Sequence, residues 1–240
     1  MSYGLTCFNA SGQLTLSSDG YLFGYIGKAT LVSITAAGTD TSGSDQSYAT
    51  YTITWGAPII CGVTLEGLST SSGSCVDWFT NSGSTWTIHV RHTNRATNSL
   101  GFLGQLSTAD VHVWGLPVSV SGFGGALYDG SGNLTADLTR RPLTFDNAIA
   151  MDVSTTSVAM TGYTNPVVVG ASNMQKVTTT PSGIHSINRN FRSLWNWDDI
   201  DGLLTRVFDV SHYELDADPV VESSHVWAAN VLLLEGASLS

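Results

Sequence analysis

The chain has 240 residues, a length that suits two domains of ordinary size. Charged residues make up 12% of the chain and apolar residues 42%, which is too apolar for a disordered protein and too poor in charge for long solvent-exposed helices. The 19 acidic residues outnumber the 9 basic residues, and the formal net charge of −10 opposes binding to the phosphates of nucleic acids.

The N-terminal sequence, MSYGLTCFNASG, lacks the basic start and apolar core of a secretory signal peptide. No stretch approaches the roughly 18 consecutive apolar residues that cross a bilayer. We therefore expect synthesis and folding in a cytoplasm and no insertion into a membrane. Export from the cell would then require a larger particle that takes the chain with it.

An internal repeat begins at this N-terminus, because residues 4–16 (GLTCFNASGQLTL) match residues 124–136 (GGALYDGSGNLTA). An ungapped alignment at an offset of 120 residues pairs identical residues at Gly4/Gly124, Ser11/Ser131, Gly12/Gly132, Leu14/Leu134 and Thr15/Thr135. Asn or Asp followed by Gly between two apolar runs is typical of a β-hairpin turn. We therefore expect the same hairpin at the start of each half.

Three further segments recur in the same order in both halves. They are a proline-led apolar strand (56–62 and 164–170), an alternating strand (86–90 and 204–208) and a His-Val-Trp strand (112–114 and 225–227). Strand signals separated by turn residues every 8–12 residues are typical of sandwiches and jelly rolls. The sequence therefore predicts an all-β protein of two tandem β-sandwich, jelly-roll-like domains, related by internal duplication, at residues 1–117 and 122–240.

Two segments differ in how clearly they indicate secondary structure. Residues 50–55 alternate polar and bulky side chains, which predicts a half-buried strand. Residues 190–202 show no period of two, so we expect a long loop or a short helical turn there.

The three cysteines, Cys7, Cys61 and Cys75, form no CxxC pair and have no zinc-type spacing to histidine. Small buried thiols are the expected reading. A disulfide between Cys61 and Cys75 is the alternative, if the mature particle is extracellular.

Few residue patterns suggest catalysis or metal binding. His89 and His92 would lie on opposite faces of a strand, and residues 129–133 lack the closing glutamate of a calcium loop. Nucleophile elbows, phosphate-binding loops and dinucleotide fingerprints are missing from the sequence. We expect a protein that is not an enzyme and that uses no cofactor and no metal ion.

Two of the seven tryptophans directly precede the densest group of carboxylates. Trp55, Trp86, Trp114 and Trp227 fall in alternating strands and are expected in the core, whereas Trp78, Trp195 and Trp197 fall near predicted loops. The candidate contacts with a ligand or partner are therefore Trp78, Trp195, Trp197, Asp198, Asp199 and Asp201. Aromatic rings beside carboxylates suit a sugar site. A solvated acidic turn is the simpler reading of the aspartates, because the first half has no equivalent group.

The opening residues 1–12, followed by a Leu-Thr strand and Ser17-Ser18-Asp19, resemble the start of small tail proteins of tailed bacteriophages. The N-termini of that family run roughly M-x-Y-G-L-x-V-F-[ND]-x-[SN]-G-x, and Cys7 stands where valine is common. The similarity covers about thirty residues, and the second copy of the domain is a departure from the family. The resemblance implies a virion component of the tail, tail tip, baseplate or fibre-attachment region, with no enzymatic residue to carry over.

The leading hypothesis is thus a non-enzymatic virion protein, either a minor tail or baseplate protein or one associated with the tail fibre. It would contact other virion proteins and form a homo-oligomer within a symmetric assembly. A receptor- or carbohydrate-binding module that contacts a host-surface glycan is the main alternative. A capsid decoration protein is the second alternative, and a cell-wall or capsule hydrolase would depend on Asp198, Asp199 and Asp201 alone.

Overall fold

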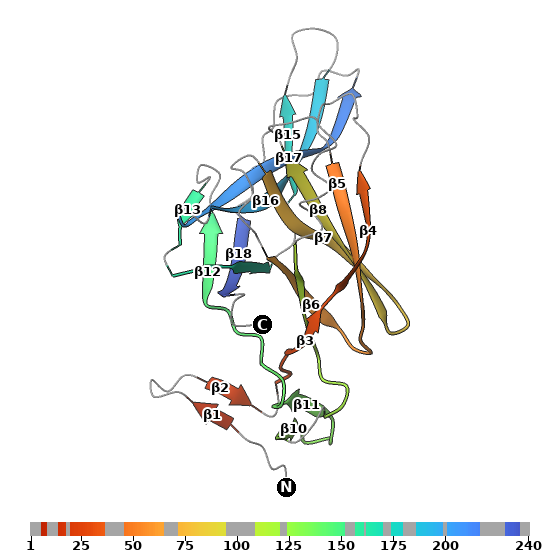
Figure 1. Cartoon of the computed structure of the whole chain (residues 1–240), viewed down its shortest axis with the longest axis vertical. Helices are drawn as coiled ribbons and strands as arrows, with labels where there is room; N and C mark the ends of the chain where they lie inside the picture. The colour runs from red at the N-terminus through yellow and green to blue at the C-terminus, as the bar shows by residue number, and fades with distance from the viewer. Residues whose placement is uncertain are drawn as a thin grey trace.

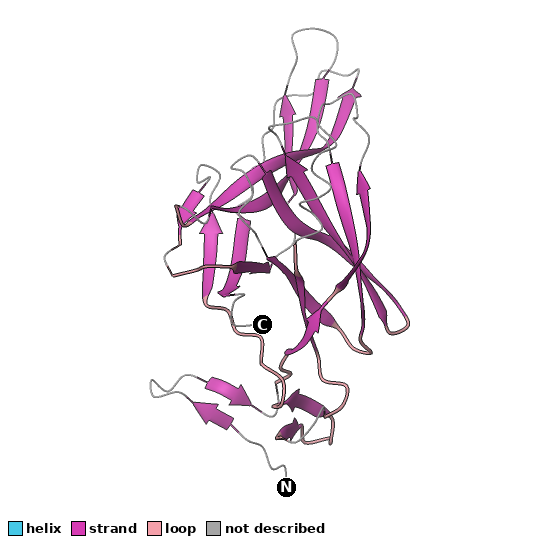
Figure 2. Ribbon diagram, viewed as in Figure 1, coloured by secondary structure: helices cyan, strands magenta, loops and turns pink. Residues whose placement is uncertain are grey.

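A computed structural model describes residues 6–8, 14–17, 20–36, 46–64, 72–94, 109–120, 124–151, 157–160, 162–169, 174–179, 186–198, 201–216 and 229–235. Every regular element within these ranges is a β-strand (Figure 2), which confirms the predicted all-β class. No helix that could cross a membrane occurs among these residues.

The described residues form eighteen strands (Figure 1). In chain order these are β1 Thr6–Phe8, β2 Leu14–Ser17, β3 Gly24–Lys28, β4 Thr30–Ala36, β5 Gln46–Thr54, β6 Ile59–Thr64, β7 Ser72–Ser82, β8 Thr85–Asn94, β9 Val111–Gly115, β10 Ala126–Tyr128, β11 Leu134–Asp137, β12 Asn147–Met151, β13 Ser157–Ala159, β14 Pro166–Val169, β15 Met174–Thr179, β16 Ser186–Asp198, β17 Leu203–Asp216 and β18 Ala229–Glu235.

Two large antiparallel sheets face each other as a sandwich. The smaller sheet has the strand order β12-β18-β14-β6-β9-β3, and the larger has the order β13-β17-β16-β7-β8-β5-β4, with β15 paired to β16. Both sheets contribute to one buried cluster, which includes Cys61, Val63 and Val113 from the smaller sheet and Tyr51, Ile88 and Val90 from the larger. Alternate residues of β5 and β8 face this core, as the pattern of residues 50–55 predicts.

The two hairpins of the repeat are β1–β2 and β10–β11, and they have identical registers. The pairs Thr6/Ser17, Cys7/Leu16 and Phe8/Leu14 correspond at the offset of 120 to Ala126/Asp137, Leu127/Ala136 and Tyr128/Leu134, and the β-bulge falls at the same place. In the second turn the backbone N–H groups of Ser131 and Asn133 both donate to Asp129 Oδ1 at 2.8 Å. Gly132 adopts a φ of 84°, which favours glycine. The predicted hairpin is confirmed.

The second hairpin leads into a segment that meets the first half of the chain. The backbone N–H of Leu22 donates to the Thr135 carbonyl at 2.9 Å, and that of Leu143 donates to the Phe23 carbonyl at 2.7 Å. Residues just before β3 are therefore bonded to β11 and to the segment between β11 and β12. Both hairpins lie at the same end of the molecule, at the bottom of Figure 1.

The smaller sheet is symmetric about its centre: counted from either edge, strands that occupy the same position in the two halves follow in the same order. The equivalences are β3 with β12, β9 with β18 and β6 with β14. The halves meet in the middle of both sheets, where Val63 of β6 pairs with Val168 of β14 and Ser74 of β7 pairs with Trp195 of β16. The order supports the duplication, and the division into domains 1–117 and 122–240 stays a prediction. Strands from both sides of that boundary share both sheets.

The predicted equivalence of residues 86–90 and 204–208 agrees with the pairing. Thr85 pairs with Ser82 directly after the β7–β8 turn, and Leu203 pairs with Asp198 directly after the β16–β17 turn. The two segments therefore open the return strands of matching hairpins.

The expected loop or helical turn over residues 190–202 is wrong, because β16 continues to Asp198. This strand is paired on both sides, with β17 on one and with β15 and β7 on the other. The register between β16 and β17 shifts at Asn190/Phe191, where β17 carries one extra residue. A strand paired on both sides in this way need not show the period of two on which recognition of a strand in a sequence depends.

The closing strand of the second half also differs from the prediction. Ile59 of β6 pairs with Gly115 of β9, and its equivalent Val167 of β14 pairs with Leu234 of β18. Gly115 thus corresponds to Leu234, whereas the His-Val-Trp alignment had placed it near Trp227. Residues 225–227 lie outside the described residues.

Candidate functional site

Among the candidate contacts that the structure describes, Trp78 lies apart from Trp195 and Asp201. Trp78 lies on β7 with 42% of its side-chain surface exposed, and Trp195 lies on β16 with 1% exposed. Trp195 belongs to the core, so its predicted place in a binding patch is wrong. Asp201 is exposed in the turn before β17. Trp197 and Asp198 end β16, their side chains are not among those described, and Asp199 lies outside the described residues.

Trp78 and the acidic turn lie far apart along the larger sheet. Ser74 and Trp195 mark where β7 and β16 pair in opposite directions. Trp78 follows Ser74 by four residues in one direction, and Asp198 follows Trp195 by three residues in the other. At about 3.3 Å per residue these positions are separated by about 20 Å. They do not form one site.

Trp78 is instead the outermost ring of an aromatic stack on the outer face of the larger sheet. Its indole lies parallel to the His89 ring, with centroids 4.3 Å apart and an angle of 19°. The Tyr48 ring lies at 65° to the indole, with centroids 5.3 Å apart. The Arg91 guanidinium lies 4.6 Å above the centroid of Tyr48. The Thr50 hydroxyl lies 3.3 Å from His89 Nδ1.

A β-bulge in β7 places Trp78 on this outer face. The register shifts between Val76 and Trp78, so Trp78 pairs with His89 and Asp77 is the extra residue. Without the extra residue Trp78 would pair with Ile88, which is fully buried. Asp77 Oδ2 accepts hydrogen bonds from Arg91, with Nε and Nη2 both at 3.2 Å. This ion pair is buried, with 3% of the Arg91 side chain and 1% of the Asp77 side chain exposed.

Burial lowers the pKa of His89, and the negative charge of Asp77 opposes that shift only in part. The imidazole is therefore neutral near pH 7. A neutral ring stacked on an indole offers one donor and one acceptor and no charge.

Three of the four tryptophans expected in the core are described, and all three are buried or half-buried. Trp55 and Trp86 pack against the core between the sheets, while Trp114 is buried in a second cluster with Val167 and Val169. The indole N–H of Trp55 donates to the Leu116 carbonyl at 2.8 Å, and that of Trp86 donates to the Trp55 carbonyl at 3.0 Å. Trp227 lies outside the described residues.

His112 is buried in the smaller sheet between two hydroxyl groups. Its Nδ1 lies 3.1 Å from the Tyr25 hydroxyl and its Nε2 lies 3.0 Å from the Thr64 hydroxyl. Burial lowers the pKa of His112 to about 4, although the nearby Asp110 carboxylate opposes the shift. The ring is a neutral structural group.

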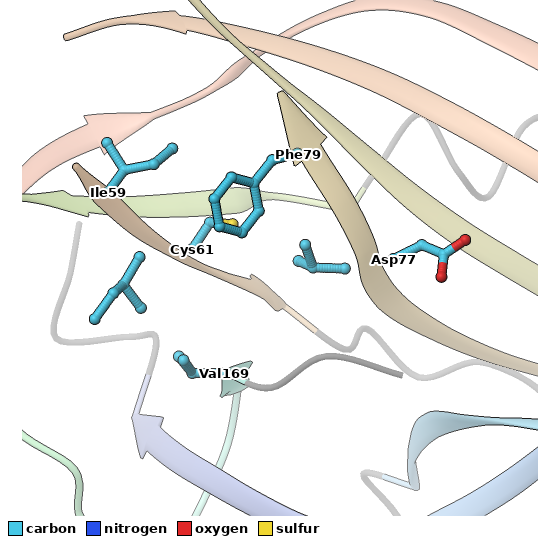
Figure 3. Close-up of a pocket in the computed structure, with 7 residues that line it drawn as sticks. Ile59, Cys61, Asp77, Phe79 and Val169 are labelled. Carbon is cyan, nitrogen blue, oxygen red and sulfur yellow. The ribbon is translucent and has the colours of Figure 1, made fainter. Parts of the chain in front are cut away.

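A pocket of about 210 Å³ opens between the two sheets (Figure 3). It is lined by Ile59, Ile60, Cys61, Val76, Asp77, Phe79 and Val169. The Asp77 carboxylate points away from the other labelled side chains, and it pairs with Arg91. The remaining lining is apolar apart from the Cys61 thiol.

The cysteines in this region are free and buried, as expected, so the alternative of a Cys61–Cys75 disulfide is wrong. Burial raises the pKa of Cys61 to about 12. The thiol stays protonated at neutral pH and is a poor nucleophile. Among the described residues, no group of three or more His, Cys, Asp or Glu side chains is arranged to hold a metal ion.

Among the residues that the structure describes, most of the large apolar side chains that are exposed lie near the two hairpins. Of the nine such side chains that are exposed among the described residues, six lie in the segments that lead into and out of the hairpins. These six are Tyr21, Val118, Val120, Tyr128, Leu138 and Phe145. We call this region the hairpin end.

Sequence reasoning missed both the aromatic stack and the hairpin end. Tyr48, Trp78 and His89 come from three strands, and only the register brings them together. The alternation of residues 50–55 could have placed Thr50 on an outer face, but the bulge at Asp77 has no sequence signature. Tyr128 could have been suspected as a contact residue, because it matches Phe8 in the repeat.

Comparison of the chain with models of protein families, with curated protein sequences and with solved structures finds no match.

Proposed function

We propose that the chain is a non-enzymatic structural protein of a tailed-bacteriophage virion, in the tail or baseplate region. The resemblance of residues 1–12 to small phage tail proteins supports this class. The observation that carries the proposal is the hairpin end, where six exposed large apolar side chains lie in and beside the hairpins. Exposed apolar groups concentrated in one region mark contacts with other proteins.

The two hairpins suit a protein that makes two similar contacts at one end. Their registers are identical, and both lie at the hairpin end (Figure 1). A duplicated contact lets one chain engage two neighbouring subunits of a symmetric partner. The chain would itself recur around the symmetry axis of that assembly.

The first test is the composition of purified particles. Density-gradient purification followed by mass spectrometry should detect the chain in intact virions and in separated tails. Its presence in heads alone would overturn the tail assignment in favour of a capsid decoration protein. Its absence from intact particles would overturn the structural role altogether.

The second test asks whether the hairpin end makes the contact. Tyr128→Asp combined with Leu138→Asp places two charges in the apolar surface, and Val32→Asp is the control, at an exposed apolar residue on β4. We expect incorporation of the double variant to fall by about tenfold or more and the control to incorporate normally. Equal incorporation of the two variants would assign the contact to another surface. Circular dichroism melts check that both variants are folded.

A further inference from the structure

The indole of Trp78 is exposed and at the same time held rigidly. Its parallel contact with His89 covers one face of the ring, and the Tyr48 ring packs against it at an angle of 65°. The residue nevertheless keeps 42% of its surface exposed. From this geometry we infer that Trp78 is the stacking platform of a carbohydrate-binding site for a neutral sugar. This activity goes beyond assembly, and it does not depend on the hairpin end.

Hydroxyl groups surround the platform on the same face of the sheet. Thr50 pairs with His89, and Thr87 pairs with both Thr52 and Thr80, so all four threonines point outward with Trp78. A hydroxyl donates and accepts hydrogen bonds, as sugar hydroxyls do. The core of a protein interface is instead rich in apolar side chains. One flat ring within a rim of hydroxyls suits a sugar better than a protein.

The electrostatics favour a ligand without charge. His89 is neutral near pH 7 because burial lowers its pKa, and the Asp77–Arg91 pair is buried and satisfies both of its charges. The net charge of −10 repels acidic sugars over longer distances. Neutral hexoses and N-acetylhexosamines meet both conditions.

The site is organised before any ligand binds. The bulge at Asp77 fixes the outward direction of Trp78, and the Asp77–Arg91 pair fixes Arg91 above Tyr48. Tyr48 in turn packs against the Trp78 ring. Rigid aromatic anchors lose little conformational entropy on binding.

Phe79 provides a matched control for Trp78. It is the next residue of β7 and has the same exposed fraction, 42%, but it lines the pocket between the sheets (Figure 3). Trp78→Ala and Phe79→Ala thus remove aromatic rings of equal exposure from opposite faces of one strand. Trp78→Phe keeps a smaller stacking surface.

The experiment measures binding of the full chain to immobilised oligosaccharides of glucose, galactose, mannose and N-acetylglucosamine, with sialylated oligosaccharides as the acidic comparison. Affinities come from titration calorimetry with the free oligosaccharides up to about 10 mM, since isolated sugar sites are weak. We expect binding to at least one neutral sugar, a loss of about tenfold or more in Trp78→Ala, and a change within about twofold in Phe79→Ala. Trp78→Phe should retain part of the affinity.

Three outcomes would overturn the inference. They are binding to no neutral sugar of the panel, equal affinity of Trp78→Ala and wild type, and preference for the sialylated sugars. Thermal melts show whether each variant is folded, so loss of binding is separated from loss of structure. Incorporation into particles reports on the proposed assembly role, and we expect Trp78→Ala to incorporate normally.

Discussion

In the folded protein the imidazole of His112 is buried and resists protonation. In the unfolded chain the imidazole is exposed to solvent and binds a proton in mildly acidic solution. The pKa in the folded protein is about 4, against about 6.5 in the unfolded chain. Among the charged groups nearby, Asp110 opposes this shift and Lys28 adds to it, but burial is the dominant cause. A depressed histidine pKa makes the folded state less stable as the pH falls below the unfolded value, because the unfolded state binds the proton first.

We therefore expect the free energy of unfolding to decrease as the pH falls from about 6.5 to about 4, by up to about 3 kcal/mol from His112. Urea titrations between pH 7 and pH 5 measure the effect before most carboxylates titrate. The variant His112→Gln should lose this part of the pH dependence. Subtracting its pH profile from that of the wild type removes the contribution of the other histidines. Parallel pH profiles for the two proteins would show that His112 titrates normally in the folded state.

Single residues also show where the sequence was a good guide to the candidate site and where it was not. Trp114 and the free thiols lie where composition and alternation place them. Trp195 was predicted near a loop and is buried, because the strand that contains it went unrecognised. Trp78 was predicted near a loop; it lies within strand β7 but is exposed, and its role as a ligand contact stays a prediction. Its partners Tyr48 and His89 could not be predicted, since their contact depends on the register of three strands and on one bulge.

At the scale of elements, the contact between β6 and β14 requires a residue without a side chain. A Cβ atom added at Gly62 would lie 2.7 Å from side-chain methyl groups of Val167 and Val169 and 3.0 Å from the Val168 carbonyl oxygen. Such distances are shorter than real Cβ contacts, and the Val168 backbone cannot move without loss of pairing to β6. Gly62 thus permits the close approach of the two halves.

Gly62→Ala should lower the free energy of unfolding by about 1–3 kcal/mol, the usual cost of overpacking a core. Gly56→Ala is the matched control, because a Cβ there would lie 3.7 Å from Val118, an ordinary contact. We expect the control to change stability by less than about 0.5 kcal/mol in urea unfolding. A fully stable Gly62→Ala protein would mean that β6 and β14 are not packed this closely.

Elements with local signals were predictable, and those fixed by distant pairing were not. The hairpins follow from Asn or Asp and Gly at fixed positions, and even their registers agree with the repeat. Strand β16 has no period of two, and its pairing to β7 joins residues distant in sequence, Trp195 and Ser74. The His-Val-Trp match involves residues 225–227, which lie outside the described residues, so it stays a prediction. Pairing identifies β18 as the equivalent of β9.

At the scale of the whole molecule, the sequence predicts the class of fold and the repeat, but not how the halves associate. Both sheets continue across the boundary between residues 117 and 122, through β6–β14 and β7–β16. One core cluster includes Val63 and Ile88 from the first half and Val168 and Leu204 from the second. A sequence does not indicate whether two repeats form separate domains or share their sheets, because the local pattern of each repeat is the same in both arrangements.

The shared sheets predict cooperative unfolding of the entire chain. Calorimetry should show one transition for residues 1–240. Residues 1–117 and 122–240 produced separately should lack cooperative melts in circular dichroism, since each fragment would expose unpaired strand edges and half of the core. A distinct, cooperative melt of either fragment would establish it as an independent domain and contradict this expectation.

The covalent link between the halves changes how the β6–β14 contact responds to dilution. Two separate chains joined only by this contact would dissociate at low concentration, whereas a tether keeps the partners at a high effective concentration, of the order of millimolar for short linkers. The pairing of Val63 with Val168 is therefore independent of how many copies a cell makes. A fused pair of this kind remains assembled even as a scarce component.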